Sequence, residues 1–271
     1  MAALEGISPS SNFLPGKLSL PSKKAGPFCF RPRTGTIASV ASRFFYPVIH
    51  LKNMEQGFAE CDKALEAGAD GVFFISHHGD DWLVVKTATY SKRQYPQSFV
   101  GINLLSSTPL VAHAEAAAYG LDAIWVDSLG TQEQELVQAC TRQPIRVFAG
   151  VAFKYQPEDT QPEATCARLA SLGFVPCTSG AATGVAADQE KITRLAKASG
   201  NGLALASGVA LDNVVAYLPY VTHYLVASSI SEDTYTLDFE KTAALAGKIH
   251  GYTAWPLFLR HLNWRDITHI V

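Results

Sequence analysis

The chain has 271 residues, of which 48% are hydrophobic and 17% are charged, and its formal net charge is -2. This composition is typical of a globular protein and excludes a disordered chain, and the near balance of charge gives no indication of nucleic-acid or membrane-surface binding. No apolar run approaches the roughly 20 residues that a membrane-spanning helix needs. The five cysteines are scattered without a CxxC pair, which favours reduced thiols in an intracellular compartment over a disulfide framework.

The first 43 residues differ in composition from the rest of the chain. Serine, proline and basic residues are frequent among them, and Glu5 is the only acid. A leader rich in Ser and Arg and poor in acids is typical of an organelle transit peptide, although an extension without any destination fits the same composition. We therefore expect residues 1–43 to be a disordered leader outside the folded domain. The protein is then cytoplasmic or, if the leader is a chloroplast address, located in the plastid stroma.

Between Phe44 and Gly251 an apolar run, a polar turn and an amphipathic stretch follow one another repeatedly. The apolar runs are rich in β-branched and aromatic residues and are apolar on both faces, as strands covered on both sides are. They are Pro47–Leu51, Gly71–Ser76, Phe99–Leu105, Ala123–Asp127, Ile145–Phe153, Phe174–Thr178, Leu203–Ala206 and Tyr224–Ala227. The stretches between them have helical spacing, and several end at a glycine just before the next strand.

Eight strands, each followed by a helix, in about 208 residues match the count and size of a (β/α)8 barrel. We therefore predict an α/β fold with a single TIM-type barrel over residues 44–251, with an open doubly wound sheet as the alternative. Residues 252–271 contain Trp255, Phe258 and Trp264. This C-terminal tail is either a short helix packed on the barrel or a segment foreign to the domain.

Titratable residues follow several predicted strands, at the end of a barrel where active sites lie. His50 ends the first strand, Asn103 the third and Asp127 the fourth, and Lys154 follows the fifth. Asp127 is the candidate acid or base, or alternatively a ligand for a sugar hydroxyl. Lys154 would pair with a substrate anion or, alternatively, form a Schiff base or act as a base. His50 and Asn103 would face the reacting end. A buried structural histidine, a loop-capping aspartate and a solvated lysine are the structural alternatives.

A pair of histidines after the second predicted strand, His77 and His78, invites a metal interpretation together with Asp80. Adjacent residues of an extended chain point in opposite directions, however, and no HxH or HxxxH spacing accompanies them. We therefore expect no metal site, and no motif indicates a cofactor.

Three loops near the end of the chain combine glycine with small hydroxyl residues. Glycine allows close backbone approach to an anion, and N–H groups at helix starts, such as the short helix expected near Asp212–Leu218, favour negative charge. Tight turns that need positive φ are the alternative. Because barrels build phosphate sites from their last two βα loops, we predict a phosphate site formed by Ser179, Gly180, Thr183, Gly184, Ser207, Gly208, Ser228 and Ser229.

The same loops resemble those of the BtpA family. Thr178–Gly184, followed by a helix from Asp188, is similar to the SGSATG-type loop of that family. The family's closing GSGV…NV…VGTS segment has similar counterparts here in Ser207–Val209, Asp212–Val214 and Val226–Ser229. Ala206 and Ala227 stand where the family tends to have glycine or valine. The resemblance extends from Pro47 to Tyr252.

This resemblance implies a TIM-type barrel with a phosphate site of the kind found in ribulose-phosphate-binding barrels. The family is named for a protein of photosystem I biogenesis, and its chemical activity is poorly defined, so it assigns no catalytic residue. We therefore predict a barrel that binds a phosphorylated, sugar- or nucleotide-like small molecule and is an enzyme, with isomerase, lyase and glycosyl transfer open. The alternative is a non-catalytic assembly or stability factor. We expect no nucleic-acid partner, and the oligomeric state, a homo-oligomer included, is left open.

Overall fold

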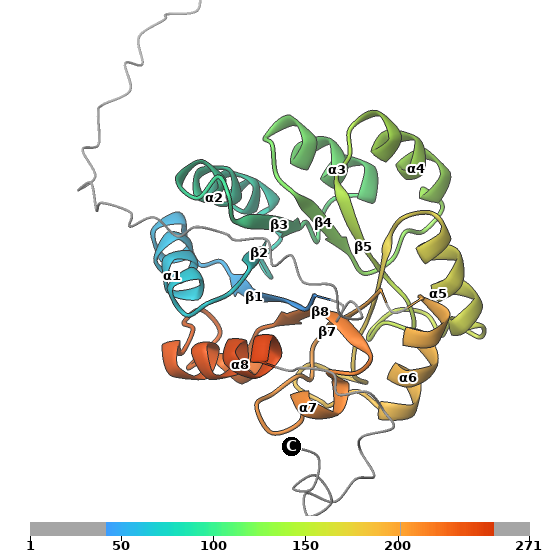
Figure 1. The fold of residues 1–271 in the computed structure, drawn as a ribbon. Helices are drawn as coiled ribbons and strands as arrows, with labels where there is room; N and C mark the ends of the chain where they lie inside the picture. The colour runs from blue at the N-terminus through green and yellow to red at the C-terminus, as the bar shows by residue number, and fades with distance from the viewer. Residues whose placement is uncertain (1–41, 201, 252–271) are drawn as a thin grey trace, which may run out of the picture. The chain divides into compact units, whose positions relative to one another are not determined.

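The computed structural model describes residues 42–200 and 202–251. Within them the strands form a closed barrel in the order β1 to β8, every neighbouring pair is parallel, and the helices surround the strands (Figure 1). The predicted (β/α)8 barrel is therefore confirmed. Apart from Ser42 and Arg43, the expected leader and the expected tail lie outside the described residues. None of the described helices combines the length and the apolar character that crossing a membrane requires.

The elements alternate along the chain as strand and helix. The strands are β1 (Phe44–His50), β2 (Gly71–Ile75), β3 (Phe99–Asn103), β4 (Ala123–Val126), β5 (Arg146–Gly150), β6 (Val175–Thr178), β7 (Leu203–Ala206) and β8 (Val221–Val226). The helices are α1 (Met54–Glu66), α2 (Asp81–Gln94), α3 (Pro109–Ala118), α4 (Glu133–Arg142), α5 (Pro162–Ser171), α6 (Gln189–Ala198), α7 (Val214–Tyr217), the 3-10 turn η1 (Ser228–Ile230) and α8 (Phe239–Gly251).

Two elements differ from the expected pattern in ways that matter for the site. β1 begins three residues earlier than predicted, and Phe44–Pro47 pair with β8, which closes the barrel. The short helix expected near Asp212–Leu218 is only a single turn, Val214–Tyr217. One turn aligns few peptide dipoles, so the loop after β7 cannot depend on a helix dipole to attract an anion.

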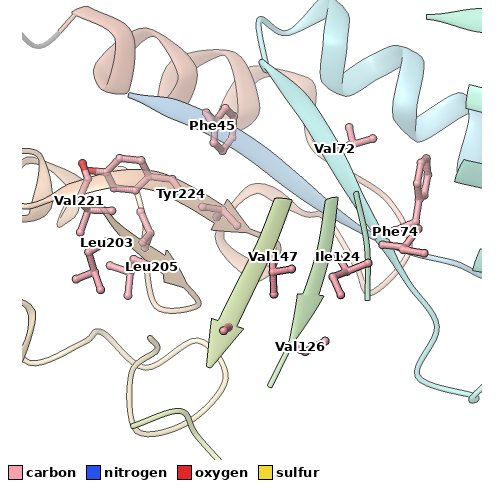
Figure 2. Packing of buried hydrophobic residues seen from close by; sticks show 14 of the residues in the cluster. Phe45, Val72, Phe74, Ile124, Val126, Val147, Leu203, Leu205, Val221 and Tyr224 are labelled. Atoms are coloured by element: carbon pink, nitrogen blue, oxygen red, sulfur yellow. The ribbon is translucent and has the colours of Figure 1, made fainter. Parts of the chain in front are cut away.

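The core has two layers, because successive residues of each strand point to opposite faces. The outer layer lies between the strands and the helices and includes Phe45, Val72, Phe74 and Ile124 (Figure 2). The inner layer fills the barrel with large aromatic side chains: Tyr46, Phe73, Trp125 and Phe148. On β3, Gly101 makes room for this layer, since a Cβ there would lie 2.3 Å from the Phe73 ring.

Polar side chains at the amino-terminal end of the barrel are tied to specific partners. Asp70, just before β2, accepts hydrogen bonds from the Phe45 N–H at 2.7 Å and from His250 Nε2 at 2.8 Å. Asp122, just before β4, accepts one from the Val100 N–H at 2.7 Å and forms an ion pair with Lys92 at 2.8 Å. Each aspartate thus fixes the start of the preceding strand.

Candidate functional site

A cavity of about 730 Å³ opens at the carboxyl-terminal ends of the strands. Its lining comes both from the ends of β1 to β4 and from the loops that follow β5, β6, β7 and β8. Most of the site residues predicted from the sequence meet in this one cavity. They are His50, Asn103, Asp127, Lys154, Thr183, Gly184, Ser207, Gly208, Ser228 and Ser229.

The alternation of the strands explains why these side chains face the cavity. On β4, Ala123 and Trp125 belong to the barrel interior, and Asp127 is the next residue in the same alternation. On β1, Tyr46 and Val48 are interior in the same way, and His50 follows them. Because side chains at every second position share a face, each polar residue continues an inward-facing row past the apolar core.

The carboxyl and the amine of the cavity have shifted proton affinities. Burial raises the pKa of Asp127, an effect that Asn103, Lys154 and His77 oppose. Burial also lowers the pKa of Lys154, and here the charge of Asp127 acts in the opposite direction. Both shifts move the groups toward neutral pH, which is how acids and bases are tuned for proton transfer in enzymes.

Two histidines stand edge to face at the mouth, with the rings of His50 and His77 4.6 Å apart. Burial lowers the pKa of His50 to about 4, and His77 and Lys154 add to this shift. His50 is therefore neutral at pH 7. His78 lies elsewhere, with Nε2 3.1 Å from the Tyr235 hydroxyl. Among the described residues no three His, Cys, Asp or Glu side chains gather as a metal site would require.

Several polar atoms of the lining are buried without a hydrogen-bond partner in the described part of the chain. They are His50 Nδ1, Asn103 Nδ2, Trp125 Nε1 and Asp127 Oδ1. The Asn103 amide interacts with the Asp127 carboxyl strongly enough to oppose its pKa rise, but forms no hydrogen bond of standard geometry. Buried polar atoms are nearly always satisfied in folded proteins, so this concentration marks the end of the barrel where a ligand would supply partners.

The other half of the cavity is built from backbone and hydroxyl groups. Ser207 and Gly208 have φ of 106° and 75°, and a Cβ at Gly208 would lie 2.0 Å from the Val185 carbonyl oxygen. The N–H groups of Gly208 and Val209 donate to none of the described residues, and the Ser228 side chain is exposed. Consecutive free amides beside a hydroxyl form the kind of concavity that binds anions.

Two residues predicted for the phosphate site, Ser179 and Gly180, do not line the cavity. The Ser179 hydroxyl is fully buried and accepts a hydrogen bond from the Lys154 N–H at 2.9 Å. Gly180 is needed for packing between loops, because a Cβ there would lie 2.0 Å from the Val185 carbonyl oxygen. In this structure they support the loops and do not face the ligand space.

The lining also contains residues to which the sequence analysis gave no phosphate-binding or catalytic role. His77 was considered only as a metal ligand, and it lines the cavity because it continues the inward row of Phe73 and Ile75. Trp125 and Phe153 are apolar and read as core in the sequence, and only the shape of the cavity shows that they line it. Tyr155 is 75% exposed and belongs to no sequence motif that would have indicated a role.

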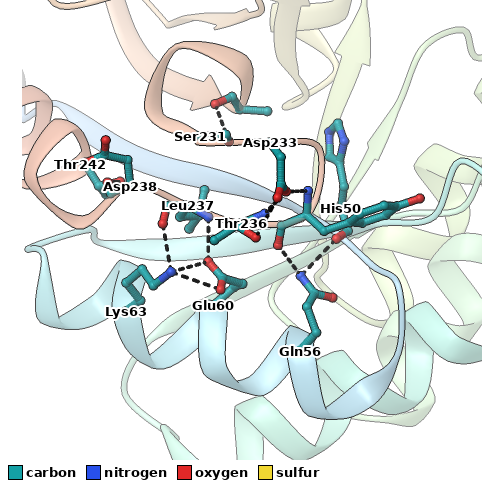
Figure 3. A network of polar contacts seen from close by, with 12 residues as sticks. His50, Gln56, Glu60, Lys63, Ser231, Asp233, Thr236, Leu237, Asp238 and Thr242 are labelled. Atoms are coloured by element: carbon teal, nitrogen blue, oxygen red, sulfur yellow. Dashed lines mark hydrogen bonds and ion pairs between the residues drawn. The ribbon is translucent and has the colours of Figure 1, made fainter.

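The end of β1 is connected to the loop between β8 and α8 through a side chain of α1. Gln56 on α1 donates hydrogen bonds to the carbonyl oxygens of His50 at 3.2 Å and Tyr235 at 2.6 Å (Figure 3). The buried Glu60 accepts from the Leu237 N–H at 2.6 Å, and Lys63 donates to the Leu237 carbonyl at 2.8 Å (Figure 3). These contacts join the first and last βα units beside His50.

No family model matches the chain, and no curated protein matches it in sequence. Solved structures do. Phosphoribosyl anthranilate isomerase from Thermus thermophilus is 17% identical with a TM-score of 0.57, covering 76% of this chain and 98% of its own. The enzyme of that name from Thermotoga maritima is also 17% identical, with a TM-score of 0.59, covering 77% and 100%. 3-Keto-L-gulonate-6-phosphate decarboxylase from Vibrio cholerae is 12% identical with a TM-score of 0.60, and the match covers 79% of this chain and 100% of the decarboxylase. At such identities the likeness shows the fold. It is a TIM barrel.

Proposed function

We propose that this protein binds a phosphorylated, sugar- or nucleotide-like small molecule in the 730 Å³ cavity and acts on it as an enzyme. The observation that carries the proposal is the division of this cavity into two halves. One half has free backbone N–H groups and serine hydroxyls, and the other has an acid, an amine and a neutral histidine. A molecule with a phosphate at one end and reactive oxygens at the other matches both.

In the proposed complex the phosphate lies on the N–H groups of Gly208 and Val209 and on the hydroxyl of Ser228, with Thr183 and Gly184 on the facing loop. Lys154 adds positive charge from the other side of the cavity. The isomerase and decarboxylase whose structures resemble this barrel carry phosphoribosyl and 6-phosphate compounds in their names, which supports a phosphorylated ligand here.

Asp127 is proposed as the acid or base, with Asn103 and His50 contacting the reacting end. The raised pKa of Asp127 and the lowered pKa of Lys154 favour catalysis over the alternative of a non-catalytic assembly factor, because shifted proton affinities cluster at catalytic sites. Isomerisation, lyase chemistry and glycosyl transfer all use such groups. Membership of the BtpA family belongs to the same proposal and is supported by the loops at 178–184 and 226–229.

The experiment that tests the proposal compares Ser228→Asp with Ser228→Asn in the full-length protein. The Ser228 side chain is exposed, so both variants should fold. Calorimetric titration with inorganic phosphate and with ribose 5-phosphate measures binding. A carboxylate beside a phosphate costs several kcal/mol at close range, so we expect Ser228→Asp to lose about 100-fold or more in affinity.

The Ser228→Asn variant has the shape of Ser228→Asp without its charge and keeps an N–H donor for the phosphate, so it is expected to lose much less affinity, within about threefold of the wild type. Equal affinities for the two variants would place the anion elsewhere. A wild-type protein that binds neither probe would remove the phosphorylated ligand from consideration. Location in the plastid, which rests on residues 1–43, is tested separately by fusing those residues to a fluorescent reporter; a cytosolic reporter would exclude it.

A further inference from the structure

Behind the cavity a half-buried cation connects two of its loops. Lys191 lies in the first turn of α6, and its Nζ donates hydrogen bonds to the carbonyl oxygens of Ala152 at 2.7 Å and Ser179 at 3.0 Å. Ala152 belongs to the loop after β5 and Ser179 to the loop after β6. Lys191 itself does not line the cavity.

The placement of this lysine is unfavourable by ordinary criteria. A positive charge in the first turn of a helix opposes the helix dipole. Burial disfavours the ammonium and lowers the pKa of Lys191, and only Asp188 acts in the opposite direction. No carboxylate of the described residues lies within ion-pair distance of its ammonium. Residues whose local placement reduces stability concentrate at functional sites. The two contacts of Lys191 with carbonyl oxygens therefore indicate a role in function.

The contacts continue from Lys191 to the amine of the cavity. Ser179, whose carbonyl receives Lys191, also accepts the Lys154 N–H on its hydroxyl at 2.9 Å. The loop that carries Lys154 has two non-glycine residues with positive φ, Ala152 at 44° and Tyr155 at 61°. Such conformations cost free energy and persist only where neighbouring groups hold them. Lys191 and Ser179 hold this loop at both of its sides.

We propose that Lys191 is a positioning residue that acts with Ser179 to hold the loop after β5, so that the Lys154 ammonium lies in the cavity beside Asp127. Lys191 is not a catalytic residue, because it acts through the loop and does not reach the cavity. The proposal rests on the proposed function only in treating Lys154 as the amine of the site.

Competitive acetylation of the full-length protein, read by mass spectrometry from about pH 6 to pH 11, tests this by giving the pKa of each lysine. The titratable groups that interact electrostatically with Lys154 come from the ends of β1, β2 and β4, from β6 and from the loop of Lys154 itself: His50, His77, Asp127, Cys177 and Tyr155. In Lys191→Met the loop loses its bond at the Ala152 carbonyl and the loop after β6 loses its bond at the Ser179 carbonyl, so Lys154 becomes more solvated. Its pKa is therefore expected to rise toward the ordinary value.

Lys86, which faces solvent beside Trp82 on α2, is the internal reference within each digest. Lys191→Arg keeps the charge and two or more N–H donors, and it should restore the wild-type profile of Lys154. A purely stabilising role would lower the melting temperature of Lys191→Met without moving the profile. An unmoved profile would therefore overturn the proposal, and so would failure of Lys191→Arg to restore it.

Ser179→Ala gives an independent reading if Lys191→Met does not fold. It removes the hydroxyl that receives the Lys154 N–H and leaves both carbonyl acceptors of Lys191 in place. The Lys154 profile should shift in the same direction, and no shift would contradict the proposal. Titration with ribose 5-phosphate keeps the two proposals apart. A wild-type protein that does not bind it, together with a shifted Lys154 in Lys191→Met, would reject the phosphorylated ligand and retain the positioning role.

Discussion

The two ends of this barrel hold polar side chains in opposite states. At the amino-terminal end Asp70 and Asp122 each receive a backbone N–H and a basic side chain. At the carboxyl-terminal end His50, Asn103 and Asp127 bury polar atoms for which the described residues provide no partner. The Asp70 and Asp122 side chains are paired although each is 30% exposed, whereas the atoms without partners at the other end are buried, where a missing partner costs more.

Backbone conformation follows the same division. The non-glycine residues with positive φ in the described part of the chain are Ala152, Tyr155 and Ser207, and all three lie in loops at the carboxyl-terminal end. Hydrogen-bonding capacity that the fold uses contributes to stability, whereas unused capacity and strain reduce it and are retained for a ligand. The amino-terminal end should therefore determine stability, and the carboxyl-terminal end should determine binding.

The largest expected effect is a loss of stability in acid, caused by one histidine at each end of the barrel, His223 and His50. Burial, reinforced by the charge of Arg146, lowers the pKa of His223 to about 4, and burial does the same for His50. The unfolded chain then takes up protons first, so stability is complete above about pH 6.5 and is lost as the pH falls toward 4, by about 3 kcal/mol per histidine. Urea unfolding at several pH values measures this loss.

His223→Gln and His50→Gln should each flatten the acid limb of the stability profile. Only His50→Gln should also change the affinity for ribose 5-phosphate, because His223 lies at the far end of the barrel interior, stacked on Phe44 at 5.2 Å. A wild-type stability that does not change between about pH 6.5 and pH 4 would contradict the low pKa of both groups.

The second prediction concerns Asp122→Asn at the amino-terminal end. The substitution removes the charge that receives Lys92 and weakens the bond from the Val100 N–H. Charge-assisted hydrogen bonds of this kind contribute about 2 kcal/mol, so the free energy of unfolding should fall by about that amount. Glu190→Gln is the surface control, since the side chain is 81% exposed and 4.0 Å from Arg194. A loss no larger than that of the control would refute the role of Asp122.

The third prediction is the matching change at the other end, Asp127→Asn. Burial raises the pKa of Asp127, so the ionised carboxylate destabilises the folded state at pH 7 and stops doing so once it is protonated in acid. The variant should therefore gain about 0.5 to 1 kcal/mol at neutral pH, as functional residues often do when they are replaced. The gain should disappear below about pH 4, where the wild-type carboxyl is protonated as well. A loss of stability at pH 7 would show that Asp127 is structural.

Strand count and strand ends could be predicted from the sequence because apolar runs of the barrel are buried on both faces. Leu203–Ala206 was predicted with the bounds that β7 has. The early start of β1 at Phe44 could not be predicted, because it depends on pairing with β8, which lies about 180 residues further along the chain. The helix expected near Asp212–Leu218 is shorter than predicted, Val214–Tyr217, and its end has a local cause, because Pro219 follows the C-cap residue Leu218 and cannot continue a helix.

The polar half of the cavity could be predicted to the extent that strand alternation continues past the strand. This rule places Asp127 and Asn103 correctly and would have found His77. The glycine-rich loops were harder. Gly180 and Gly208 look alike in sequence, and a Cβ on either would meet the Val185 carbonyl oxygen, yet only Gly208 lines the cavity. Which side of a loop faces a ligand depends on how neighbouring loops pack, and spacing carries no record of that packing.

The smallest effect expected belongs to Tyr155, which lies between the two halves of the cavity. Its hydroxyl accepts a hydrogen bond from the Thr183 N–H at 3.3 Å, and its ring is 75% exposed. Tyr155→Phe should change the free energy of unfolding by less than about 0.5 kcal/mol, because exposed substitutions rarely do more. Affinity for ribose 5-phosphate should nevertheless fall about threefold to tenfold, since this bond joins the Lys154 loop to the phosphate loop. Calorimetry and urea unfolding on one preparation separate the two quantities. An unchanged affinity would mean that the two loops are arranged independently of each other, and a large loss of stability would mean that Tyr155 belongs to the part of the barrel that determines stability.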